Sequence, residues 1–253
     1  MPRYFLEVAY KGTDYSGFQS QENALTVQAE VEKAFSTLQR VPVVMTGSSR
    51  TDAGVHALQN FFHFDFEESL HPQFTYKINA ILPDAIVVKS LRGVKADAHC
   101  RFDAVYRRYR YYLYNTKDPF KEGRAWFYPY PLNKELLQAA ALILLEVDDF
   151  TSFSKRNTQV KTFLCQLTES QWVEEDGCLL YAVKGNRFLR GMVRALTSTQ
   201  LLVGRGKIGL AEFQQIIEAR NCELASFAAP PHGLFLEAVH YPSELLTNCV
   251  SNY

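Results

Sequence analysis

One short segment of the chain concentrates side chains that could perform acid–base or nucleophilic chemistry. It runs Gly47-Ser48-Ser49-Arg50-Thr51-Asp52-Ala53-Gly54-Val55-His56-Ala57, with a single carboxylate at its centre. A carboxylate can act as a nucleophile or take up a proton, and Arg50 can supply a counter-charge or bind a phosphate. The two glycines permit a left-handed backbone or a close approach to a ligand. Judged by turn chemistry alone, however, Asp52 is more often a turn residue that bonds its own backbone.

Motifs of several other enzyme classes do not occur in the sequence. There is no G-x-S-x-G nucleophile motif and no G-x-x-x-x-G-K-[ST] phosphate loop. Asp52 also lacks the D-x-D spacing with which aspartate-nucleophile phosphohydrolases hold magnesium. The five cysteines form no C-x-x-C unit and the six histidines form no H-x-x-x-H unit. We therefore expect reduced cysteines and no structural or catalytic metal.

The composition is that of a globular protein that is neutral overall but has its charge unevenly distributed. The 253 residues are 47% hydrophobic and 21% charged, with 27 basic and 27 acidic side chains. From Lys184 to Lys207 there are six basic residues and no acidic one. This pattern is compatible with a basic groove for a polyanion, and equally with a solvated face that has no partner. No apolar run approaches the ~20 residues of a membrane span, so we expect a cytoplasmic protein.

The elements that must position Asp52 are predicted from hydrophobic periodicity. Val41–Met45 and Phe61–Phe66 have the composition of strands, which places Asp52 on a loop between them. Thr26 is expected to cap a helix whose apolar stripe belongs to the core. The other expected elements are strands at Tyr4–Tyr10 and Ala85–Leu91, helices at His71–Ala80, Asn133–Leu145 and about Leu210–Arg220, a hairpin of Thr162–Val173 with Leu179–Gly185, and a long irregular connection at Asn115–Pro131.

A second region alternates arginine and tyrosine between Ala98 and Asn115. Strand geometry places Arg108, Arg110 and Tyr112 on one side and Arg107, Tyr109, Tyr111 and Leu113 on the other. For Tyr109, ordinary strand packing and a role in binding are equally good explanations from this pattern alone.

A third region, Arg187–Val203, is predicted to be an amphipathic helix. At 100° per residue Arg187, Arg190 and Arg194 share one face. The opposite face carries Leu189, Met192, Val193 and Leu196. The helix is therefore expected to bury its apolar side and to present a row of guanidinium groups.

The order strand, long loop, helix, strand occurs twice, beginning near Tyr4 and again near Arg108. We therefore predict an α+β protein with two halves of like topology, residues 1–104 and 105–253. The first half carries the Asp52 loop, and the second carries the Tyr109 strand and the basic helix.

Several of these stretches resemble one known family, the TruA-type tRNA pseudouridine synthases. Ser49–Ala57 is similar to the signature G-x-R-T-D-x-G-V-H around the catalytic aspartate of that family. Departures are Phe18 where tryptophan is typical, Cys100 where alanine is common, and Arg187 and Ser198 where glycine is frequent. The resemblance covers nearly the whole chain and includes Gly17–Gln21 (G-W-Q-x-Q), His99–Tyr111 (H-A-R-F-x-A-x-x-R-x-Y-x-Y), Asp149–Phe153 (D-F-x-S-F), Gly185–Arg194 (G-N-x-F-L-x-x-M-V-R) and Gly233–Tyr241 (G-L-x-L-x-x-V-x-Y).

The resemblance implies a fold and a set of site residues. The fold is the pseudouridine synthase fold, in which two similar α/β halves share a mixed, mainly antiparallel central sheet with the active-site cleft between them. The implied catalytic residues are Asp52, Arg194, which would pair with it, and Tyr109. The implied substrate contacts are the loop residues Phe18, whose ring could stack on a base, and Gln19, the leucines Leu234 and Leu236 at the uracil, and the arginines Arg50, Arg107, Arg108, Arg187 and Arg190 at phosphates.

The implied activity is an isomerisation of uridine to pseudouridine in tRNA, at positions 38, 39 or 40 of the anticodon arm. An isomerisation needs no cofactor, and none is expected. The resemblance further implies a homodimer with no membrane association. The alternative that the sequence leaves open is a non-catalytic RNA-binding module or RNA chaperone on the same fold, in which Asp52 is only a turn residue.

Overall fold

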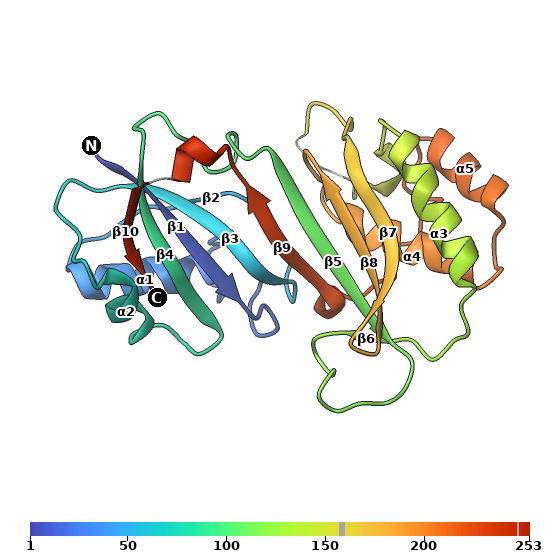
Figure 1. Ribbon diagram of the computed structural model, residues 1–253, viewed down its shortest axis with the longest axis horizontal. Helices are drawn as coiled ribbons and strands as arrows, with labels where there is room; N and C mark the ends of the chain where they lie inside the picture. Colours follow the sequence, from blue (N-terminus) through green and yellow to red (C-terminus); the bar gives the residue numbers. More distant parts are fainter. Residues whose placement is uncertain (157–159, 247) are drawn as a thin grey trace. The chain divides into compact units, whose positions relative to one another are not determined.

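The computed structural model describes residues 1–156, 160–246 and 248–253, and it consists of two compact units (Figure 1). Unit 1 comprises Met1–Tyr106 together with Leu236–Tyr253, and unit 2 comprises Arg107–Phe235. The last residues belong to unit 1 because strand β10 (Asn248–Asn252) pairs with β4 (Ile86–Val94). Among the described residues, no helix is long and apolar enough to cross a membrane.

Unit 1 is built on an antiparallel sheet in the order β10, β4, β1 (Arg3–Tyr10), β3 (His56–Asp65). The register places Leu6 of β1 between Leu91 of β4 and Phe62 of β3. Helices α1 (Val27–Gln39) and α2 (Phe74–Asn79) pack on this sheet. The ring of Phe35 in α1 contacts Phe64 of β3 and Phe74 of α2. The core is rich in aromatic rings, which bury a large apolar area per residue.

Unit 2 is built on β5 (Tyr106–Tyr114), β8 (Cys178–Gly185) and β7 (Leu167–Glu175), paired antiparallel in that order. The short strand β6 (Trp126–Phe127) pairs with β5 in parallel. Helix α3 (Lys134–Ile143) contacts β7, α4 (Met192–Gly204) and α5 (Leu210–Glu218), so the three helices form one layer beside the strands (Figure 1). Strand β9 (Leu234–His240) spans the boundary between the two units. Short 3₁₀ helices occur at Leu144–Glu146, Thr151–Phe153, Pro231–Gly233 and Ser243–Leu246.

The predicted mixed α and β content with mainly antiparallel pairing is confirmed. Thr26 and Asn133 cap α1 and α3 as predicted, accepting hydrogen bonds from Ala29 and Leu136 backbone N–H groups. The predicted hairpin also forms, and its turn at Asp176 and Gly177 has φ angles of 49° and 67°, as the two-residue turn of a twisted hairpin requires. Its first strand begins at Leu167, later than predicted.

The strand predicted at Val41–Met45 is wrong. No strand forms there, and the strand that leads into the Asp52 loop is the short β2 (Thr46–Gly47), which pairs with β3. The backbone of Met45 is bound instead by side chains of α1: its N–H donates to Glu32 Oε1 (2.8 Å) and its carbonyl accepts from Gln28 Nε2 (2.8 Å). Pro42 lacks an N–H, which further weakens a ladder at this position.

Candidate active site

Asp52 lies in unit 1 on the loop Ser48–Val55, which joins β2 to β3 and is called the Asp52 loop below. Its backbone carbonyl accepts a hydrogen bond from the Val55 N–H (3.2 Å), and Gly54 has φ of 78°. The turn therefore needs a left-handed residue at Gly54, which glycine provides without steric cost. Asp52 itself is partly exposed, whereas its neighbour Thr51 is buried.

Buried polar side chains hold the Asp52 loop against the sheet. Asn60 of β3 is fully buried and donates from Nδ2 to the Ser49 carbonyl (2.9 Å), while its Oδ1 accepts from Ser48 Oγ (2.7 Å). The hydroxyl groups of Tyr10 and Thr51 are 2.7 Å apart and share a hydrogen bond. These contacts fix the backbone on the N-terminal side of Asp52, because a buried polar group loses much free energy when its partner moves away.

Two glycines of the segment after β1 let that segment pass close to the Asp52 loop. A Cβ on Gly12 would lie 2.0 Å from the Val55 carbonyl oxygen. The N–H of Gly12 donates to Nδ1 of buried His56 (3.1 Å), so this ring nitrogen is an acceptor without a proton. At Gly17, with φ of 108°, a Cβ would lie 3.2 Å from the Thr51 carbonyl oxygen.

Phe18 occupies the core beneath the Asp52 loop. Only 1% of its surface is exposed, and its ring stacks on Phe62 with centroids 4.6 Å apart. A Cβ on Gly47 would lie 2.2 Å from the Phe18 ring, so the two segments are in close contact. This placement does not support the predicted stacking of Phe18 on a base. The neighbouring Gln19 and the loop residue Arg50 are exposed and line a pocket in unit 1.

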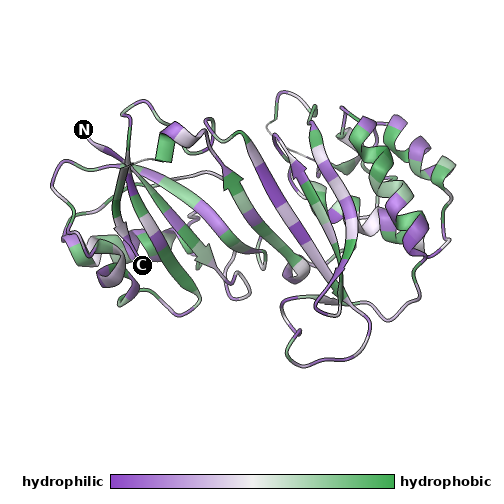
Figure 2. Ribbon diagram, viewed as in Figure 1, coloured by the Kyte–Doolittle hydropathy of each residue, from purple (hydrophilic) through white to green (hydrophobic). Residues whose placement is uncertain are grey.

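Strand β5 holds three of the predicted site residues of unit 2 and is mainly hydrophilic (Figure 2). The predicted sides of the strand are confirmed, because Arg107, Tyr109 and Tyr111 are buried and Arg108 and Arg110 are partly exposed. The ring of Tyr109 packs edge-on against Phe188, with centroids 4.9 Å apart. Arg107 donates from an Nη to the Asn186 carbonyl (3.1 Å).

The arginines on the other side of β5 are paired with carboxylates of β7. Arg108 makes two hydrogen bonds to Glu169 (2.6 and 2.9 Å), and Arg110 binds Glu175 (2.9 Å). Burial raises the pKa of Glu169, but the hydrogen bonds from Arg108 and Gln171 and the charges of Arg108 and Lys184 together outweigh burial and hold that pKa below its ordinary value. The predicted phosphate contact of Arg108 therefore competes with an ion pair inside unit 2.

The basic helix face predicted for residues 187–203 is wrong in its first half. Helix α4 begins only at Met192, so Arg187 and Arg190 precede it and share no helix face with Arg194. Gly191 has φ of 75°, which a right-handed helix cannot include, so the helix cannot extend further toward the N-terminus. Arg194 lies in the first turn of α4 and donates from Nε to the Ala229 carbonyl (2.7 Å).

The two leucines predicted at the uracil lie at the start of β9, and both are buried. Leu234 is preceded by Gly233, where a Cβ would lie 2.8 Å from the Tyr111 ring. The Tyr111 hydroxyl donates to the Pro230 carbonyl (2.8 Å), so β5 supports the segment that leads into β9.

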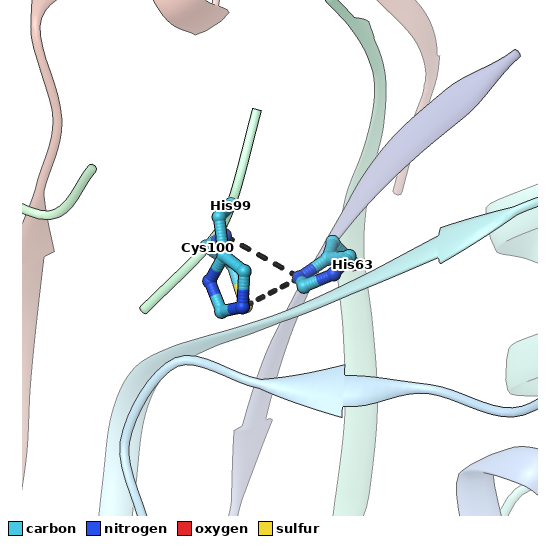
Figure 3. A group of neighbouring side chains, drawn as sticks. All are labelled: His63, His99 and Cys100. Carbon is cyan, nitrogen blue, oxygen red and sulfur yellow. Dashed lines mark hydrogen bonds between the residues drawn. The ribbon is translucent and has the colours of Figure 1, made fainter. Parts of the chain in front are cut away.

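One group of side chains in unit 1 offers metal-binding atoms: His63 of β3 with His99 and Cys100 (Figure 3). Their donor atoms lie within 4.8 Å of one another. His63 Nδ1 is 3.1 Å from Cys100 Sγ, and that thiol donates to the Thr46 carbonyl (3.1 Å). Burial, with the nearby charges of His99 and Arg3, lowers the pKa of His63 to about 4. The hydrogen bonds give these groups a structural role, and the absence of a metal stays a prediction.

Two exposed residues, Arg101 and Phe102, are not among the site residues predicted from the sequence. Phe102 is 74% exposed, and both residues line the pocket beside Arg50 and Gln19. The H-A-R-F motif contains both residues and was the available signal, but a phenylalanine in a motif gives no indication of whether it faces the core or solvent.

Comparisons with known proteins agree on one family. A family model described as tRNA pseudouridine synthase matches residues 7–103 and 140–242. Proteins named tRNA pseudouridine synthase A from Porphyromonas gingivalis and Bacteroides fragilis are 45% and 43% identical over 250 and 246 residues, or 97% and 96% of this chain and 99% and 98% of theirs. The protein of the same name from Staphylococcus aureus (strain MRSA252) is 38% identical over 94% of this chain and 91% of its own. The chain belongs to the tRNA pseudouridine synthase family.

Proposed function

We propose that this protein isomerises uridine to pseudouridine in the anticodon arm of tRNA, at one or more of positions 38, 39 and 40. Family membership supports the reaction. The proposed location of the active site rests on the structure of the Asp52 loop. Asp52 is partly exposed, and buried contacts hold the residues on both sides of it. Because these contacts already order the backbone, placing the carboxylate against a substrate costs little further ordering of the chain.

The reaction breaks the C1′–N1 bond of uridine and forms a C1′–C5 bond. N1 gains a proton and C5 loses one, so the isomerisation is balanced without a cofactor. In this proposal Asp52 attacks C1′ or the base, or takes a proton from the ribose. The target base leaves the stack first, at a cost of a few kcal/mol that is smallest in loops and weak stem ends.

Arg194 and Tyr109 complete the proposed site from unit 2. Desolvation of Asp52 by the flipped base costs several kcal/mol. A guanidinium at ion-pair distance returns on the order of 4 kcal/mol at an effective dielectric of 20, and this is the proposed role of Arg194. Tyr109 is proposed to contact the base and assist loss of the C5 proton. Arg50, Arg187 and Arg190 are proposed to bind phosphates.

We further propose that the enzyme acts as a cytoplasmic homodimer on tRNA. A single tRNA would then contact both subunits, as the family resemblance implies. Light scattering of the free protein and of its tRNA complex measures this stoichiometry directly.

The test of the reaction is tritium release from tRNA labelled at uracil C5. Wild type is expected to release tritium, whereas Asp52→Asn and Asp52→Ala release none and still bind tRNA with near-normal affinity. Asp84→Asn, an exposed aspartate of the same unit, is the matched control and should keep full activity. Full activity of Asp52→Ala would exclude the proposal and favour an RNA-binding module without catalysis.

A further inference from the structure

A pocket in unit 1 lies beside the Asp52 loop, and most of the residues that line it have no proposed role. Its volume is about 220 Å³. Pockets that enclose a whole drug-sized ligand have ~300–1,000 Å³, so this one suits a single flat group. Its polar lining includes Gln19, Arg50, His99 and Arg101, and no acidic residue in the described part of the chain lines it. The pocket therefore favours an anionic or electron-rich ligand.

Of the two phenylalanines that line the pocket, Phe18 is buried and Phe102 is exposed. It is 74% exposed, and its ring lies next to His99, with centroids 4.2 Å apart. The Arg101 guanidinium lies 5.8 Å from the centre of the same ring. An exposed aromatic face beside guanidinium groups is the combination with which proteins stack on nucleic-acid bases and hold the adjoining phosphates.

The turn that carries Phe102 is held in place by several contacts. The N–H groups of Phe102 and Asp103 donate to the His99 carbonyl (3.1 and 3.0 Å), and the His99 N–H donates to Asp103 Oδ2 (2.7 Å). His63 and Cys100 anchor the same turn to the sheet below (Figure 3). The ring is therefore presented by a rigid support, which lowers the entropy cost of stacking a ligand on it.

Arg50 connects this pocket to the proposed site of chemistry. It lines the pocket, yet only Thr51 separates it from Asp52, so the chain between the two residues spans at most ~7 Å. It is exposed, and in the part of the chain that the structure describes no carboxylate forms an ion pair with it. A ligand in the pocket that also contacts Arg50 is thus a close neighbour of the group that reacts.

We propose that this pocket binds a nucleotide of the RNA that flanks the target uridine. Its base stacks on Phe102, and its phosphate is held by Arg50 and Arg101. The proposal rests on the proposed function, since it takes RNA as the substrate, and adds to it a contact that helps to select the uridine that reacts.

The test measures binding of a stem-loop RNA of anticodon-arm sequence to the full-length protein. Phe102→Leu keeps an apolar side chain but removes the aromatic face, so the Kd should rise by about 5- to 150-fold, the range for loss of one base stack. Phe102→Trp should bind at least as well as wild type. Tyr76→Leu, at a 67% exposed tyrosine of α2, is the matched control and should leave the Kd unchanged.

A second set of RNAs separates stacking from a structural effect. Each nucleotide flanking the target is replaced in turn by an abasic one, and wild type and Phe102→Leu are compared on every RNA. At one flanking position the two changes should be non-additive, because both remove the same contact. Additive effects at every position, or an unchanged Kd for Phe102→Leu, would overturn the proposal.

Failure of this proposal is distinguishable from failure of the proposed function. Tritium release by wild type together with an unaffected Phe102→Leu variant rejects the pocket alone. Absence of tritium release together with a weakened, non-additive Phe102→Leu variant rejects the catalytic function and supports the pocket as an RNA-binding site.

Discussion

The Asp52 loop and strand β5 both carry predicted site residues, but they hold them in different ways. The loop has no ladder of its own, and individual buried contacts, such as that from Asn60 to the Ser49 carbonyl, determine its backbone. Strand β5 pairs residue by residue with β8 from Arg107 to Leu113, and its outward arginines form ion pairs at a partly exposed surface. A change in one contact should therefore displace the loop, whereas the strand should tolerate the loss of a side chain.

The largest effect is expected for Gly12→Ala. The new methyl group would lie 2.0 Å from the Val55 carbonyl oxygen, a backbone atom that can move only with the Asp52 loop. We expect a loss of about 3 kcal/mol in the free energy of unfolding and, because reacting groups tolerate little misplacement, about a 100-fold loss in kcat. Urea unfolding and tritium release measure the two effects.

Gly209→Ala is the matched control for this prediction. A Cβ at Gly209 would have no heavy atom within 4 Å, and its φ of −85° is allowed for alanine. The control should leave stability and activity close to wild type. If Gly12→Ala were as stable and as active as Gly209→Ala, the Asp52 loop would tolerate the added methyl group, and the contrast with β5 would not hold.

Asn60→Ala tests the buried polar support of the same loop. The substitution removes the hydrogen bonds that the Ser49 carbonyl and the Ser48 hydroxyl make with Asn60, in a buried environment. We expect about 2 kcal/mol of destabilisation and a clear fall in kcat, measured as for Gly12→Ala. Asn60→Asp keeps the acceptor for Ser48 but loses the donor to Ser49, so a fully active Asn60→Asp would assign the support to the acceptor side alone.

The same contrast explains what the sequence could predict. The sides of β5 followed from alternation, because in a strand the backbone geometry alone determines where each side chain points. The caps at Thr26 and Asn133 followed from local chemistry for a similar reason. The family motif identified Asp52, but its support by Tyr10 and Asn60 depends on long-range pairing that no local pattern encodes.

Two of the three errors arise from contacts between residues distant in sequence, and one has a local cause. Val41–Met45 has strand composition, yet side chains of α1 bind the Met45 backbone and leave no ladder to join. The predicted helix at residues 187–203 ignored Gly191, whose left-handed backbone places Arg187 and Arg190 before the first turn. The burial of Phe18 depends on the Phe62 ring, which lies more than forty residues further along the chain.

A pH titration tests a buried polar contact in unit 1, because the hydrogen bonds of His63 depend on whether its ring is charged. Burial first, and then the charges of His99 and Arg3, lower the pKa of His63 to about 4. The unfolded chain takes up this proton near pH 6.5, so the unfolded state binds more protons than the folded state between pH 6.5 and 4, and stability falls as the pH falls through that window.

Between pH 7 and pH 5 this single group should remove about 2 kcal/mol of unfolding free energy. Urea unfolding at the two pH values should show that part of the pH dependence disappearing in His63→Gln. The exposed His71→Gln is the control and should retain it. An identical pH dependence in wild type and His63→Gln would mean that His63 is not held neutral.

The smallest effect is expected for the ion pair of β5 with β7. Arg108 and Glu169 have side chains 29% and 18% exposed, and a double-mutant cycle with Arg108→Ala and Glu169→Gln should give a coupling of about 1 kcal/mol in stability. Because Glu169 already holds the guanidinium, the salt dependence of tRNA binding should be the same for Arg108→Ala and wild type. A fall in slope of about 0.7 to 0.9 would instead indicate the loss of one phosphate contact. In that case tRNA displaces Glu169, and β5 presents its arginines to the substrate as the family resemblance implies.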